Sequence, residues 1–176
     1  MIHSPALVIV LLTILSCTPG DQDDGATVHA AYAALMDSLT GPTGYTAIPG
    51  ARLTINAERS VANQPPAPRW VITEFAERGI PVVRTGTPLC PGEYRFAFGP
   101  ARPLTRHAYV IEVDVLSMSE YGFGDSEIFE YRVDCGTGSC AVARPRQLEQ
   151  GEIGGDRRCT GSAATPGSLR EPSSSR

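Results

Sequence analysis

The feature that most constrains the fold is a stretch near the C-terminal end in which two cysteines flank a short turn. Residues 129–144 read FEYRVDCGTGSCAVAR, and alternate residues up to Cys135 are apolar, as in a half-buried strand. The four residues between Cys135 and Cys140 have a common hairpin length, so the pattern predicts two antiparallel strands. Cys135 then lies opposite Cys140, and Val133 opposite Val142, at a spacing that suits a disulfide.

Hydrophobic periodicity and chain breakers divide the rest of the chain into two helices followed by strands. Long strands joined by short loops predict an α+β fold, in which two N-terminal helices pack on an antiparallel meander sheet. This order of elements is similar to that of cystatin-like and NTF2-like folds. The predicted helices are residues 26–40 and 70–78; the predicted strands are residues 45–57, 80–83, 94–98, 107–118, 127–135 and 140–145; residues 119–126 and 146–158 are predicted loops.

The chain begins with an apolar run, from Ala6 to Leu15, that is too short to span a bilayer as a permanent helix. Such a run is typical of an export signal. It closes with Ile14-Leu15-Ser16-Cys17, which resembles the lipobox of bacterial lipoproteins. The resemblance implies cleavage before Cys17, diacylation of this cysteine and attachment to a membrane from outside the cytoplasm. The residue after the cysteine is Thr18 rather than Asp, which favours the outer membrane in a cell that has one.

Composition then divides the chain into four parts. Residues 1–16 are the predicted signal peptide, and residues 17–25 are the predicted lipidated cysteine with a flexible tether rich in Asp and Gly. Residues 26–160 are long enough for one domain with a single core. Residues 161–176 are rich in Ser, Gly and Pro without periodicity, so we expect a disordered tail.

With the lipidated Cys17 set aside, four cysteines remain: the hairpin pair, Cys90 and Cys159. An even number of cysteines in an exported chain predicts disulfides, and elimination pairs Cys90 with Cys159. A redox pair, a zinc site and free thiols are the alternatives. A redox pair usually has the form Cys-x-x-Cys at the start of a helix, and zinc needs Cys and His ligands at close spacing. Neither pattern is present in the sequence, so we expect no metal or cofactor.

The net charge of −4 argues against one class of partner. A nucleic-acid partner would require a concentrated basic surface, and this chain is mildly acidic. All fifteen basic residues other than histidine are arginines. An arginine can make bidentate contacts with carboxylates and can stack on aromatic rings, which gives individual sites a possible binding role.

Charged residues alternate with the apolar ones along the predicted strands. Glu112 and Asp114 project from one side of the strand 107–118, and Arg95, Glu130 and Arg132 are expected to join them from neighbouring strands. If this side is open to water, it is an outer face with weak cross-strand ion pairs. If the sheet curls around it, the same residues and His107 form a polar pocket.

No nucleophile motif or metal spacing accompanies these charges in the sequence. We therefore expect a non-catalytic lipoprotein of the cell envelope, which binds an envelope partner or a small ligand. One alternative is a small hydrolase or isomerase that uses Asp114, Glu112 or His107 in a pocket on the curved sheet. The other alternative is a purely structural or assembly role.

Overall fold

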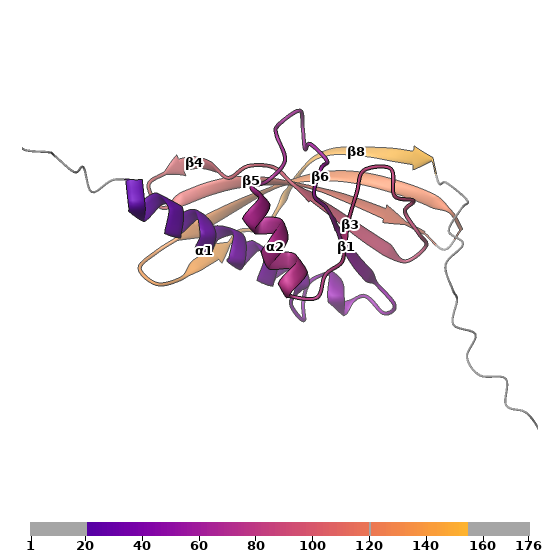
Figure 1. Ribbon diagram of the computed structural model, residues 1–176, viewed down its shortest axis with the longest axis horizontal. Coiled ribbons are helices and arrows are strands. Elements are labelled where there is room, and N and C mark those ends of the chain that lie inside the picture. The colour runs from indigo at the N-terminus through magenta and orange to yellow at the C-terminus, as the bar shows by residue number, and fades with distance from the viewer. Residues whose placement is uncertain (1–20, 120, 155–176) are drawn as a thin grey trace, which may run out of the picture.

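The computed structural model describes residues 21–119 and 121–154, and these residues form one mixed sheet with two α-helices. The chain is therefore α+β, as the sequence predicts. In Figure 1, α1 begins at the left-hand end of the molecule and β8 ends at the right-hand end. The elements are α1 (Asp21–Thr40), η1 (Tyr45–Ala47), β1 (Arg52–Asn56), α2 (Arg69–Glu77), β2 (Val82–Val83), β3 (Glu93–Phe98), β4 (Arg102–Thr105), β5 (Ala108–Met118), β6 (Phe123–Cys135), β7 (Cys140–Val142) and β8 (Arg146–Gly154).

The sheet has the order β2-β1-β3-β5-β6-β7, with β4 added to β5 and β8 added to β6. The prediction of an antiparallel sheet holds for β3, β5, β6, β7 and β8, but β1 is parallel to both β2 and β3. Parallel neighbours need a long crossover. The chain between β1 and β3 provides one, because it contains α2 and β2.

The predicted Cys hairpin is confirmed. Cys135 pairs with Cys140 and Val133 with Val142 across β6 and β7, and the two cysteines form a disulfide. Cys90 is also disulfide-bonded. Its predicted partner, Cys159, lies outside the described residues, so this pairing stays a prediction.

Several element boundaries differ from the predicted ones. Residues 146–154 are the strand β8 rather than a loop, and β6 begins at Phe123 rather than at residue 127. The side chains of β8 are mostly exposed, so its backbone pairing leaves no apolar alternation in the sequence. The helix α1 begins at Asp21, inside the predicted tether, because a polar composition argues against burial but does not prevent an extra turn of backbone hydrogen bonds.

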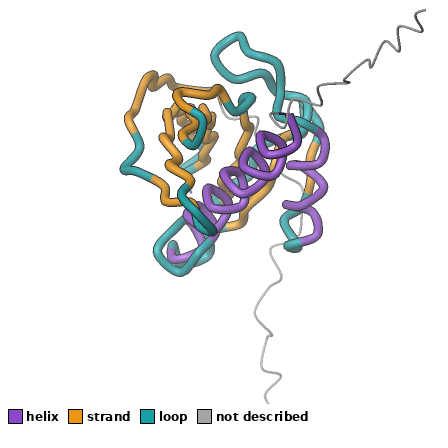
Figure 2. The backbone as a smooth tube through the Cα atoms, turned by 90° about the vertical axis from the view of Figure 1, so that its left-hand side faces the viewer, coloured by secondary structure: helices purple, strands orange, loops and turns teal. Residues whose placement is uncertain are grey.

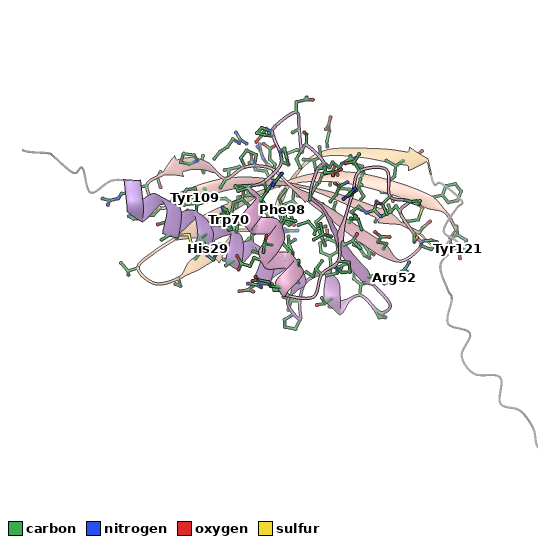
Figure 3. All side chains as sticks on the ribbon, viewed as in Figure 1. His29, Arg52, Trp70, Phe98, Tyr109 and Tyr121 are labelled. Atoms are coloured by element: carbon green, nitrogen blue, oxygen red, sulfur yellow. A yellow bond between two sulfur atoms is a disulfide. The ribbon has the colours of Figure 1, made fainter. Side chains whose placement is uncertain are left out.

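Both helices lie against one side of the curved sheet, where Figure 2 shows them next to each other. Apolar residues spaced along α1 and α2 meet the inward residues of β3, β5 and β6. His29 of α1 stacks on Trp70 of α2 with ring centroids 4.9 Å apart, and Figure 3 shows the two labelled side by side. The fully buried members of this core with the largest side chains are Tyr32, Phe75, Phe96, Phe98, Leu35, Met36, Ile55 and Ile111.

A smaller cluster lies on the opposite side of the sheet. Leu116 and Met118 of β5 pack there with Leu89 and with Ile153 of β8. This contact joins the last described strand to the segment that carries Cys90. No helix among the described residues is long and apolar enough to cross a membrane.

Candidate functional site

The charged residues that the sequence places on one side of the sheet divide into a buried set and an exposed set. Arg95, Glu112 and Asp114 are 4%, 5% and 2% exposed, on the side away from the helices. His107 and Arg132 are exposed. His107 lies in the turn between β4 and β5, and Arg132 forms an ion pair with its neighbour Asp134 on β6.

Glu112 and Asp114 are covered by the loop between β1 and α2, so this side is neither an open face nor an empty pocket. Arg59 from that loop donates to Asp114, and Ser126 donates to the other carboxylate oxygen at 3.0 Å. Gln64, also from the loop, donates to Glu112 at 2.9 Å, and Arg102 of β4 forms an ion pair with it.

The oxygens of both carboxylates thus accept hydrogen bonds from other residues of the chain. This pattern is typical of a buried structural network, because buried charges are tolerated only when they are paired and hydrogen-bonded. Alternation along the strand points to Glu112 and Asp114, but nothing in the sequence points to Arg59 and Gln64, because a loop of irregular backbone gives no periodic signal that shows where it folds.

Arg95 forms a second buried network with Glu93, a residue that the sequence analysis misses. Its Nη2 donates to Glu93 Oε1 at 2.6 Å and to the Pro88 carbonyl at 2.8 Å, and its Nη1 donates to the Thr87 carbonyl. Thr54 Oγ1 donates to the same Glu93 oxygen at 2.6 Å. The arginine therefore ties the segment before Cys90 to strand β3.

The pKa of Glu93 reflects these contacts. Burial raises the pKa of this carboxyl, but hydrogen bonds from Thr54, Arg95 and the Cys90 amide, together with the arginine charge, outweigh burial and hold the pKa below its ordinary value. The carboxyl is therefore ionised inside the fold. This carboxylate holds the Cys90 segment in position and is not free to react.

Shallow grooves elsewhere on the surface are lined by other residues. One groove of about 490 Å³ lies between the end of α1, η1 and β6, and it is lined by Leu39, Tyr45, Ile48 and Tyr131 among others. Burial, followed by the charge of Glu127, raises the pKa of Tyr45 to about 12, so its hydroxyl is neutral. Within residues 21–154 as described, no group of three or more His, Cys, Asp or Glu side chains is placed to hold a metal ion.

Among the large apolar side chains that the structure describes, the two most exposed lie at the tip of the hairpin that joins β5 to β6. Tyr121 is 87% exposed and Phe123 is 75% exposed. Figure 3 shows Tyr121 at the right-hand end of the molecule, far from His29 and Trp70. Solitary exposed apolar residues are common, but two exposed aromatic residues two positions apart at a hairpin tip are typical of a contact surface.

The helix side of the sheet is open near this tip. The core positions of β5 end at Val115, and the next residue on the same side is the half-buried Ser117. Asp125 of β6 pairs with Ser117 on one side and with Glu152 of β8 on the other. We call this surface the open face; its residues are Ser117, Phe123, Asp125, Glu127, Gln150 and Glu152.

The open face carries negative charge that no described residue neutralises by an ion pair. Asp125 and Glu152 are exposed and directly opposite each other, and opposed like charges destabilise a strand pair. Glu127 accepts a hydrogen bond from Gln147 at 3.1 Å. None of these three carboxylates forms an ion pair within the described ranges, which include many arginines.

Sequence reasoning misses the open face because Gly122 and Gly124 suggest a loop. In the structure Gly124 lies within β6, and a Cβ atom there would approach Ile153 Cγ1 to 2.5 Å. The glycine thus makes room for the strand β8. Phe123, Asp125 and Glu127 continue the series of every second residue to which the apolar positions farther along β6 belong. This shared spacing is the signal that could have placed them on one side.

Comparison with known proteins returns no relative. No protein-family profile, no curated protein and no solved structure matches the chain significantly.

Proposed function

We propose that this protein is a non-catalytic lipoprotein of the cell envelope that binds another envelope protein through its β5–β6 hairpin end. The observation that carries this proposal is the exposed pair Tyr121 and Phe123 beside an open, charged part of the sheet. Every predicted catalytic carboxylate, in contrast, is engaged in an internal contact.

The geometry of an anchored chain supports this role. The lipobox-like residues 14–17 lie outside the described residues, and the four residue steps from Cys17 to Asp21 can span at most about 14 Å. A lipid on Cys17 would therefore hold the start of α1 near the membrane. Close to that start, the Cys135 sulfur lies 4.0 Å from the Thr27 carbonyl, at the far end of β6 from Phe123.

The distance between the two ends follows from strand geometry. Phe123 precedes Cys135 by twelve residues along β6, which corresponds to about 40 Å. An anchor at the start of α1 leaves the hairpin tip at the opposite end of the molecule (Figure 1). The Cys135–Cys140 disulfide supports the proposed location in the cell envelope, because such bonds persist in oxidising compartments outside the cytoplasm.

We also propose the finer fold assignment, similarity to the cystatin-like and NTF2-like class. It is supported by two helices on one side of a curved sheet with a long β5–β6 hairpin. The parallel pairing of β1 departs from a simple meander. The alternative activities, a small hydrolase or isomerase and a structural or assembly role, stay predictions.

Two measurements on the full chain in its own cell test the proposed function. Metabolic labelling with an alkyne fatty acid should label the wild-type chain and not the Cys17→Ser variant. A photo-crosslinking amino acid at Tyr121 or Phe123 should then capture a protein of the envelope. Leu104 is the matched control position, since it is 54% exposed and lies on β4 near the α1 end.

We expect crosslinks from the hairpin tip and none from Leu104. An unlabelled Cys17 would refute the anchor. Equal crosslinking from Leu104 and Tyr121, or none from either, would refute the binding surface.

A further inference from the structure

We infer that the open face binds an extended, arginine-bearing segment of a second protein, which adds as a strand to the free edge of β8. This inference rests on the proposed function and names the chemistry of the partner. It combines three features of the same end of the molecule: carboxylates with no ion pair and a strand edge with no partner, both judged over residues 21–119 and 121–154, and exposed aromatic rings.

The charge of the open face selects a basic partner. Asp125 and Glu152 are exposed cross-strand neighbours, and Glu127 follows two residues along β6. With no ion pair to these carboxylates in the parts of the chain that the structure describes, their repulsion is relieved by an incoming cation. A guanidinium suits the pair because it can bond two carboxylate oxygens at once.

The aromatic rings favour the same partner. Phe123 is on β6 two residues before Asp125, so alternation places both on the open face. Arginine stacks on aromatic faces while it pairs with carboxylates, and Tyr121 at the tip extends the aromatic surface. A lipid surface is disfavoured, because an anionic membrane would be repelled by the adjacent carboxylates.

The edge of β8 supplies the backbone partners. Among the described strands, β8 pairs only with β6, so its other edge is unpaired. Residues 146–154 contain no proline, and the side chains of Gln150 and Glu152 are exposed. A strand that adds to this edge places every second side chain on the open face, beside Glu152. The bound segment is therefore expected to carry arginine at alternate positions.

The test uses purified mature protein and a fluorescent peptide of four Arg-Thr repeats, with binding followed by anisotropy at fixed salt. The variant Asp125→Asn with Glu152→Gln removes two charges from the open face. The control Glu77→Gln with Glu149→Gln removes two charges from exposed positions elsewhere; Glu149 is on β8 but pairs with Ile128, on the other side of the sheet.

We expect the open-face variant to weaken binding about tenfold, since two exposed ion pairs are lost, and the control to change it less than about twofold. A peptide of the same composition with its four arginines contiguous should bind more weakly than the alternating one. Equal losses in both variants would indicate nonspecific attraction to an acidic protein and would overturn the inference. Equal binding of the two peptides would overturn the edge-pairing geometry.

Vesicles distinguish the remaining alternative. Sedimentation of the protein, without its lipid, with phosphatidylglycerol vesicles in a Phe123-dependent manner would show a membrane surface instead and overturn the inference. If crosslinks form at Tyr121 or Phe123 while the peptide results fail, the partner chemistry is wrong and the proposed function stands. If no crosslink forms and no peptide binds, both fail.

Discussion

The buried pair of Glu93 and Arg95 gives the sharpest test of the structure. We propose the substitution Arg95→Met, which keeps an unbranched apolar stem and removes the guanidinium. In the folded protein this deletes two bonds to Glu93 Oε1, at 3.1 Å and 2.6 Å, and the bonds to the Thr87 and Pro88 carbonyls. It leaves a carboxylate that is buried to the same extent but has lost its counter-charge.

The expected magnitude follows from that uncompensated charge. Removal of one partner from a buried ion pair typically costs about 3–5 kcal/mol of unfolding free energy. The side chains of Glu93 and Arg95 are only 8% and 4% exposed, so solvent screening is slight. The double variant Arg95→Met with Glu93→Gln should lose less than the sum of the single variants, because no bare charge remains.

Equilibrium unfolding in urea measures these losses, with the single tryptophan of the chain, Trp70, as the fluorescent probe. Arg132 and Asp134 provide a matched control. They have the same i, i+2 spacing on a strand, but both are exposed. Arg132→Met should leave the urea midpoint unchanged. A loss of unfolding free energy below about 1 kcal/mol for Arg95→Met would show that the Glu93–Arg95 pair does not stabilise the fold as the structure implies.

The pH dependence adds an independent check with a definite sign. The pKa of Glu93 is lowered in the folded protein, so the stability from its ionised form is complete above the ordinary pKa of a carboxyl. It is lost as the pH falls through the lowered folded value. The stability difference between wild type and Glu93→Gln should therefore shrink on acidification. A difference that is constant between pH 7 and pH 3 would contradict the assignment.

Three further predictions concern a glycine in β6, the hairpin disulfide and the second cysteine pair. Gly124→Ala should lower the unfolding free energy by about 1–3 kcal/mol in the same urea assay, because the added methyl meets Ile153. Replacement of both Cys135 and Cys140 by Ser should cost about 2 kcal/mol from loop entropy, measured against the reduced wild type as a second reference. Non-reducing peptide mapping should recover Cys90 linked to Cys159; a peptide that links Cys90 to any other cysteine would disprove the predicted pairing.

The part of the fold that sequence could predict is the part that is local. The register of β6 and β7 follows from alternation and from two cysteines that flank a four-residue turn. The parallel pairing of Arg52 with Glu93 has no such local signal, because a helix and a short strand separate the two residues. No alternation predicts the polar strand β8, because its pairing uses the backbone and its side chains contribute almost nothing to the core.

The candidate site shows the same division. Alternation correctly placed Glu112 and Asp114 on the side of the sheet away from the apolar residues. It could not show that Arg59 and Gln64 would fold over them, because the course of a loop depends on tertiary contacts. The sequence therefore indicated where charge would lie, but not whether that charge would be buried or available.

The open face has a simple geometric origin. Strand β6 has thirteen residues and is about 43 Å long, whereas the twenty residues of α1 extend about 30 Å. The helix contacts β6 and β7, near Cys135, so it cannot also cover the far end of β6. An uncovered strand end in a monomer would favour polar residues throughout. The combination of Phe123 with Asp125 and Glu152 is better explained by a partner that buries the ring and neutralises the carboxylates together.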